Sequence, residues 1–439
     1  MFINIAPPLS ISSRIKNPFE LKVNSSKPWS TLFHSSSSNN VNSINNIGHV
    51  TDNTNLDPLI GTSYKNLLRS PTTQLRGLIN QGNLCFANTI FQSLLFCPPF
   101  YNFFNLLAFN QPIDLQNKTP LIEGTIEFLK NFRKLSINEL EYGEPFIPNE
   151  IYKSLKFYDR FSSFQSGQQQ DAEEFLGFFL DTLNEELLKI LPSIKQRRQN
   201  DLLSWLNELD QYLNKDFDDG WLEVTPKSKS NVNSINAHDS PLTKIFSGKL
   251  RSVVKSPGQK DSVTIEPFQP LQLDIEPSNV NSLEDALCNL SKPEVISGVK
   301  SSLHKETLID VTKQITLDQT PPILITHLKR FLYDNIGGVQ KSHKSIAFNT
   351  ILTIPQQILS PMIRSSNPIK YKLFAVIYHH GKSSTSGHYT IDVLSQNLNQ
   401  WVHIDDISME LINEDQVKVD SYKPNDDDKV AYLLLWSKL

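Results

Sequence analysis

Cysteine is scarce in this chain of 439 residues, which has only Cys85, Cys97 and Cys288. Three thiols cannot build a disulfide framework, and so sparse and odd a number is typical of a reducing compartment. They also cannot complete two Cys-x-x-Cys pairs, which excludes a structural zinc ion held by four cysteines. We therefore expect a cytoplasmic protein, with the nucleus as a second compartment. The remaining question is whether one of the thiols carries chemistry.

Long apolar runs and an excess of positive charge are also missing. No stretch approaches the roughly 20 consecutive apolar residues that a membrane span requires. The N-terminal residues lack the charged leader and long apolar segment of a secretory signal, so secretion is not expected. The 42 Lys and Arg residues against 46 Asp and Glu residues give a formal net charge of -4. Such a balance predicts no basic surface for nucleic acid or anionic lipid, so we expect neither partner.

The chain divides into a head and a folded part. Residues 1–72 are rich in Ser and Asn and predict a disordered extension, in which the apolar cluster of residues 29–34 is either a chance grouping or a short docking motif. Residues 73–439 carry dense apolar periodicity and predict one domain, interrupted by a surface insertion at about 192–240. Within the insertion, Leu202 to Leu213 have the spacing of an amphipathic helix.

Helices are expected first and strands later, which indicates an α+β fold. One helix is predicted from Cys85 to Phe96, ended by Pro98, and another from Asp171 to Leu191, ended by Pro192. Runs rich in Val, Ile, Leu and aromatic residues predict strands at Val263–Ile275, Ile323–Leu328, Tyr371–Tyr378, Tyr389–Leu394, Trp401–Ile404 and Val430–Trp436.

Cys85 is the best placed of the three thiols. Gly and Asn residues at 77–83 indicate a tight turn before it, and an apolar periodic run begins at the thiol, so Cys85 is expected at a helix N-terminus. The positive end of the helix dipole stabilises a thiolate there, although a small buried hydrophobic residue is the simpler alternative. Cys97 and Cys288 lie in apolar helical surroundings and are expected to be inert.

A thiolate nucleophile needs a base and a group that orients the base. His388 follows a loop of small residues at the entrance of a predicted strand, and the next strand ends in Asp405 and Asp406. If the two strands pair, Asp405 can receive the Nδ1–H of His388.

Five segments, in this order, together resemble the ubiquitin-specific proteases. They are residues 77–88 around Cys85, 169–176, 321–331, 387–389 and 401–406, and the resemblance covers about Leu75 to the C-terminus. It implies a papain-like fold with a helical thumb and β-rich palm and fingers, acting as a deubiquitinating thiol protease. By matching positions, Cys85 is the nucleophile, His388 the general base, Asp405 its orienter and Asn80 the side-chain oxyanion donor.

The resemblance also implies contacts with substrate. Asp171 and Glu174 match an acidic pair that meets arginines of the ubiquitin tail, although capping of their own helix is an alternative role. Gly387 and Tyr389 would border the slot for the Gly-Gly end of ubiquitin, and Asp406 would assist beside the triad. The expected partners are ubiquitin and ubiquitinated proteins, and no cofactor is implied.

Two departures from the family pattern are visible. Leu84 replaces the usual Thr before the nucleophile, and Ser256 and Gln259 occupy the first Cys-x-x-Cys pair of the fingers, so we expect fingers without zinc and no metal site. In both departures the chain resembles the subfamily of ubiquitin carboxyl-terminal hydrolase 10. This resemblance implies a scaffold partner with a nuclear-transport-factor-like domain.

Three alternatives stay open at this point. The chain could be a catalytically weak or inactive scaffold that binds ubiquitin, or a protease for another ubiquitin-like modifier. It could also be an acyltransferase or transglutaminase, because these enzymes use similar Cys, His and Asp residues.

Overall fold

The computed structural model describes Leu67 and residues 72–109, 119–136, 139–165, 169–196, 200–214, 232–234, 240–300, 308–333, 339–383, 386–395, 398–418 and 429–439. Apart from Leu67 and Thr72, the expected extension of residues 1–72 lies outside this part, and so does most of residues 215–239 of the expected insertion. Residues Leu59–Val299 and Leu308–Leu439 belong to one compact unit.

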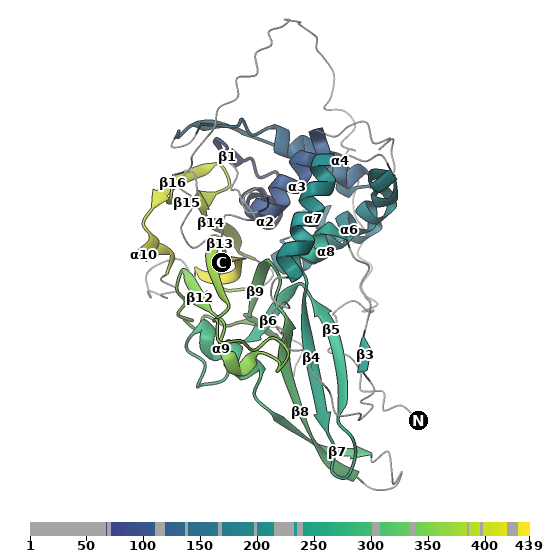
Figure 1. Cartoon of the computed structure of the whole chain (residues 1–439). Coiled ribbons are helices and arrows are strands. Elements are labelled where there is room, and N and C mark those ends of the chain that lie inside the picture. The colour runs from purple at the N-terminus through teal and green to yellow at the C-terminus, as the bar shows by residue number, and fades with distance from the viewer. Residues whose placement is uncertain are drawn as a thin grey trace, which may run out of the picture. The chain divides into compact units, whose positions relative to one another are not determined.

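Helices dominate the first half of this unit and strands the second (Figure 1). The helices are α2 (Cys85–Leu95), α3 (Pro98–Phe109), α4 (Pro120–Lys130), α5 (Asn149–Leu155), α6 (Ala172–Gln196), α7 (Asn200–Asn214), α8 (Pro241–Phe246), α9 (Leu283–Leu290) and α10 (Glu414–Val417). Two early strands, β1 (Leu75–Leu78) and β2 (Tyr142–Phe146), pair in parallel. The α+β prediction is confirmed.

The helix predicted at Cys85 begins at that residue, and Pro98 and Pro99 start the next helix, where a missing N–H costs nothing. The predicted end at Pro192 is wrong, because α6 runs through this proline to Gln196. Proline removes one helical hydrogen bond, but Leu191 and Ile194 on either side of it are buried in the core. Their burial keeps the last turn helical.

The amphipathic helix expected in the insertion is α7. Its residues Leu202, Trp205 and Leu209 are buried, and the helix packs against α3 and α8. The apolar spacing in this stretch therefore reflects packing on the helical core. The bounds of the insertion stay a prediction.

The central sheet holds five of the six strands that the sequence analysis expected downstream. The single strand expected at Val263–Ile275 is wrong, because it divides into β5 (Ser262–Phe268) of the second sheet and β6 of the central sheet. Its order is β16-β15-β14-β13-β17-β9-β6, with β12 also paired to β13 (Figure 1). Its strands are β6 (Pro270–Asp274), β9 (Ile323–Lys329), β12 (Ile351–Thr353), β13 (Lys370–His380), β14 (His388–Ser395), β15 (Gln400–Asp405), β16 (Ser408–Ile412) and β17 (Val430–Lys438). Nearly every residue of β9, β13, β14 and β17 is buried, so the sheet is the centre of the core.

A second sheet corresponds to the expected fingers. Its order is β3-β5-β4-β8-β7, and its longest strands lie side by side in Figure 1. The strands are β3 (Val232–Ser234), β4 (Gly248–Lys255), β5 (Ser262–Phe268), β7 (Glu294–Lys300) and β8 (Leu308–Gln319), and a short pair is formed by β10 (Phe331–Tyr333) and β11 (Val339–Lys341). In the turn after β4, the Gln259 N–H donates to the Ser256 carbonyl at 3.2 Å. The prediction that no zinc is held here is untested.

Helix α2 connects the helical part to the central sheet. It packs against β14 and against α6, and its Phe86 and Phe91 contact Phe175 of α6 with ring centroids 5.4 and 5.7 Å apart. Every residue of α2 is buried. Its N-terminus is thereby held at the strand that begins with His388.

Among the described helices, none is long and apolar enough to cross a membrane.

Candidate active site

A left-handed turn delivers Cys85 to the start of α2. Gly82 and Asn83 have φ values of 83° and 63°, a region that glycine and asparagine enter at low cost. The helix cap, Leu84, makes no side-chain hydrogen bond to the first turn. The N–H groups of that turn therefore receive no hydrogen bond from the side chain of the cap residue.

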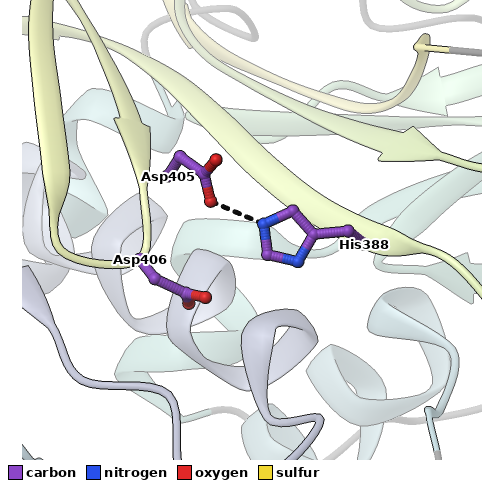
Figure 2. Close-up of side chains that lie close together, drawn as sticks. All are labelled: His388, Asp405 and Asp406. Atoms are coloured by element: carbon purple, nitrogen blue, oxygen red, sulfur yellow. Dashed lines mark hydrogen bonds and ion pairs between the residues drawn. The ribbon is translucent and has the colours of Figure 1, made fainter. Parts of the chain in front are cut away.

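His388 and Asp405 meet because β14 and β15 pair in antiparallel register, with Ile391 opposite Ile404. His388 opens β14 and Asp405 closes β15, and His388 Nε2 lies 2.5 Å from Asp405 Oδ1 (Figure 2). The expectation that Asp405 receives the Nδ1–H is therefore wrong. Asp405 holds Nε2, which leaves Nδ1 as the ring nitrogen available to the thiol.

The Cys85 side chain is the largest of the influences that raise the pKa of His388 to about 9. Partial burial opposes this rise, and the hydrogen bond to Asp405 adds to it. His388 is therefore an imidazolium at neutral pH.

Asn80 is fixed by two hydrogen bonds. Its Oδ1 accepts from the Leu84 N–H at 2.9 Å, and its Nδ2 donates to Asp406 Oδ2 at 3.0 Å. The backbone of Asp406 is in turn held by the Leu78 N–H, which donates to its carbonyl at 2.9 Å. Asp406 thus lies against the segment that leads to Cys85, and its carboxylate faces Asn80.

The predicted contacts with the ubiquitin tail lie at the start of α6. Asp171 Oδ1 accepts from the Glu173 N–H at 2.7 Å, and Oδ2 accepts from the Tyr432 hydroxyl at 2.6 Å. Capping of α6 by Asp171 is therefore confirmed. Burial and the Asp171 charge raise the pKa of Glu174. The contact of these residues with ubiquitin stays a prediction.

Gly387 and Tyr389 flank His388 on opposite sides in the chain. A Cβ on Gly387 would overlap the His380 carbonyl oxygen and lie 2.6 Å from His379 Nε2, so only glycine fits. Tyr389 is buried, and burial raises the pKa of its hydroxyl while the Ala172 backbone lowers it. Tyr389 of the His388 strand therefore lies near the start of α6.

Three residues near the site have no role in the sequence-based prediction. Gln169 Nε2 lies 3.8 Å from the Cys85 sulfur, Asn88 Nδ2 donates to Asp406 Oδ1 at 3.1 Å, and the Tyr152 hydroxyl donates to Asn88 Oδ1 at 2.7 Å. Asn88 follows Cys85 by three residues on a helix, a spacing that puts both on one face. That spacing was the available signal.

His388, Asp405 and Asp406 are also close enough in the described part of the chain to qualify as a group of metal-ligand type (Figure 2). Their carboxylates instead accept hydrogen bonds from His388, Asn80 and Asn88. Hydrogen bonding within the protein accounts for the group.

Comparison with known proteins agrees with the resemblance. The family model described as ubiquitin carboxyl-terminal hydrolase matches residues 76–436. The probable ubiquitin carboxyl-terminal hydrolase 3 of Schizosaccharomyces pombe is 37% identical over 405 residues, covering 88% of this chain and 78% of the relative. Ubiquitin carboxyl-terminal hydrolase 10 of Xenopus tropicalis is 35% identical over 401 residues, covering 85% of this chain and 49% of the relative. The chain thus spans about half the length of that second relative.

Solved structures bear on the fold. The SAGA Ubp8/Sgf11/Sus1/Sgf73 DUB module bound to ubiquitin aldehyde matches with a TM-score of 0.57 and 21% identity, over 83% of this chain and 70% of that chain. A yeast SAGA DUB module matches with a TM-score of 0.59 and 22% identity, over 83% of this chain and 68% of that chain. The expected fold class, a papain-like protease with thumb, palm and fingers, is confirmed.

Proposed function

The chain belongs to the ubiquitin carboxyl-terminal hydrolase family and is a cysteine-type deubiquitinase, and we propose that Cys85, His388 and Asp405 form its triad. The reaction is hydrolysis of the isopeptide bond after the C-terminal glycine of ubiquitin. The observation that carries the assignment is the arrangement of thiol, imidazole and carboxylate, in which His388 Nε2 lies 2.5 Å from Asp405 Oδ1 and the helix that begins at Cys85 packs against the strand that begins at His388.

In the first step the Cys85 thiolate attacks the carbonyl carbon of the glycine. A carbon–sulfur bond forms and the carbonyl oxygen becomes an oxyanion. We assign its stabilisation to the Cys85 N–H and to Asn80. Two hydrogen bonds support this role of Asn80: Asp406 accepts one Nδ2 hydrogen, and the Leu84 N–H donates to Oδ1. The second Nδ2 hydrogen is therefore the one that Asn80 can donate to the oxyanion.

Collapse of the oxyanion breaks the carbon–nitrogen bond. The leaving lysine amine has a solution pKa near ~10.4 and cannot depart as an anion, so the imidazolium of His388 gives it a proton. The thioester that remains is hydrolysed by water, which His388 deprotonates. The products are the free ubiquitin carboxylate and the Cys85–His388 pair in its starting state.

The ubiquitin tail is proposed to lie between the start of α6 and the strand of His388. Asp171 and Glu174 would pair with its arginines. The pKa of the partly buried Glu174 carboxyl is raised by burial and by the Asp171 charge. A cation beside Glu174 would stabilise its carboxylate against both effects. The Gly-Gly end would pass Gly387 and Tyr389, the two residues on either side of His388 in the chain.

A scaffold partner with a nuclear-transport-factor-like domain is a further part of the proposal, supported by similarity to ubiquitin carboxyl-terminal hydrolase 10 of other species. Co-purification of the full chain with such a domain tests it. A location in the cytoplasm, with the nucleus as the second compartment, is proposed from the cysteine content alone and is tested by imaging a tagged full chain.

Turnover of ubiquitin carrying a C-terminal fluorogenic amide tests the reaction. Cys85→Ala should abolish turnover, and Asn80→Ala should lower kcat by about 10²- to 10³-fold, the usual effect of one lost oxyanion donor. Cys288→Ser, which changes a thiol on α9, is the matched control and should behave as wild type. Turnover retained by Cys85→Ala would contradict the assignment of the nucleophile.

A further inference from the structure

Three residues behind the oxyanion site extend the hydrogen bonds of Asn80 into the protein. Asp406 uses both carboxylate oxygens, with Oδ2 accepting from Asn80 at 3.0 Å and Oδ1 accepting from Asn88 at 3.1 Å. Asn88 Oδ1 accepts in turn from the Tyr152 hydroxyl at 2.7 Å. The connected side chains are therefore Tyr152, Asn88, Asp406 and Asn80, in that order.

These residues come from four separate segments. Tyr152 lies on α5, Asn88 on α2, Asp406 in the turn after β15, and Asn80 in the turn before α2. Asn88 is only 2% exposed, and the Tyr152 ring packs against Phe91 with centroids 5.8 Å apart. The inner end of the series is thus fixed by the helical core, whereas Asn80 lies at the site.

The direction of each hydrogen bond is determined by the chemistry of the groups. A carboxylate only accepts, so Asp406 requires the amide nitrogen of both Asn80 and Asn88. Asn88 must then present its oxygen to Tyr152, which donates. Burial and the negative charges of Asp406 and Cys85 raise the pKa of Tyr152, so the phenol keeps its proton. No amide in the series can flip without a repulsive contact.

The backbone of Asp406 is fixed, whereas its carboxylate is held by its hydrogen bonds to Asn80 and Asn88. Asp406 has a φ of 48°, a left-handed conformation in a tight turn, and its carbonyl already holds the Leu78 N–H. If Asn88 did not hold Oδ1, the carboxylate could rotate about its side-chain bonds. Asn80 would then lose the acceptor that fixes which hydrogen it turns to the substrate.

We propose that Asn88 and Tyr152 are positioning residues for the reaction, which act through Asp406 to aim the Asn80 amide at the oxyanion. The proposal rests on the function proposed above. Neither residue touches the reacting atoms. Their effect should therefore appear in kcat and should exist only while Asn80 is present.

The experiment is a double-mutant cycle with Tyr152→Phe and Asn80→Ala on the full chain, with ubiquitin fluorogenic amide as substrate. Tyr152→Phe alone removes one hydroxyl and should lower kcat by about 2- to 10-fold, the rate equivalent of one hydrogen bond, with KM unchanged. In the Asn80→Ala background the same change should cost less than about 1.5-fold, because the amide that it positions is gone.

Tyr158→Phe is the matched control, since the hydroxyl of this partly buried tyrosine donates to Glu186 of α6 rather than to Asn88. It should leave kcat as in wild type. An equal loss from Tyr152→Phe in both backgrounds, or a loss confined to KM, would overturn the proposal. A general loss of stability lowers both backgrounds alike and so gives the equal-loss result.

Asn88→Asp supplies a second arm, because it puts a carboxylate beside Asp406. It should lower kcat more than Tyr152→Phe does, with the melting temperature recorded for each variant. A kcat equal to wild type in Asn88→Asp would also overturn the proposal. Failure of the proposed function is distinct, because it would show as turnover by Cys85→Ala.

Discussion

Asp405→Asn separates the charge of the orienting group from its hydrogen bond. The amide oxygen of asparagine can still accept from His388 Nε2, as the carboxylate does at 2.5 Å, but it carries no negative charge. Asp405→Ala removes both the acceptor and the charge. Comparison of the two variants therefore shows how much of the effect of Asp405 is orientation and how much is stabilisation of the imidazolium.

The size of each effect follows from the geometry. A hydrogen bond to a charged group contributes about 1.5–3 kcal/mol and a neutral one about 0.5–1.5 kcal/mol. The side chains of His388 and Asp405 are 35% and 46% exposed, so solvent screening places the contribution at the lower end. We expect about a 5-fold loss of kcat for Asp405→Asn and about a 10- to 30-fold loss for Asp405→Ala, with KM unchanged.

The assay combines steady-state turnover of ubiquitin fluorogenic amide with an NMR titration of His388. Both variants should lower the His388 pKa, because the bond and the charge of Asp405 both raise it in the native protein. His403→Gln is the control, since it breaks the other imidazole–carboxylate pair of β14 and β15, at 2.5 Å from Asp392. Wild-type kcat in Asp405→Ala, together with an unchanged His388 pKa, would refute the reasoning.

Four further experiments test other parts of the site. Because the pKa of His388 is raised to about 9, kcat for an isopeptide should fall as pH rises through about 9, whereas a ubiquitin thioester, whose leaving thiolate needs no proton, should be affected less. The raised pKa of His388 adds stability that is fully present below pH 6.5 and is lost as pH rises through about 9. The melting temperature of His388→Ala should therefore change less with pH than that of wild type in this window. Burial first, and Asp171 second, raise the pKa of Glu173 to about 7, so ionisation costs stability as pH rises from 4.5 to 7. Glu173→Gln should melt above wild type at pH 8 and together with it near pH 4.5, and equal melting temperatures at both values would contradict this. Gly387→Ala should push His388 away from the thiol and lower kcat at least 10-fold, at a cost of about 1–3 kcal/mol in stability, because its Cβ would overlap the His380 carbonyl. Wild-type activity in Gly387→Ala would mean that the loop has room to spare.

Local patterns explain why much of the fold could be predicted. The start of α2 at Cys85 follows from a Gly and Asn turn before an apolar run, and the strands of the central sheet are long, buried and rich in branched residues. The strands of the fingers were harder to predict from the sequence, because most residues of β4 and of β8 are only half buried. Sheets exposed on both faces leave no clear apolar alternation in the sequence.

Contacts between distant segments explain what could not be predicted. Helix α6 continues past Pro192 because Leu191 and Ile194 find buried places, which local propensity does not show. The ring nitrogen that meets Asp405 depends on the approach of β15 to β14, and the neighbours of Asp406 depend on the packing of α5 and α2. Residue types and spacing indicate a triad, but they do not give its orientation.

Reaction with a ubiquitin probe that carries a thiol-reactive C-terminus, followed by mass spectrometric mapping of the adduct, tests the central claim most directly. The account predicts one adduct, on Cys85, in wild type and none in Cys85→Ala. Burial raises the pKa of both Cys97 and Cys288, so neither should react. An adduct on either of these thiols, or an undiminished adduct in Cys85→Ala, would contradict the account.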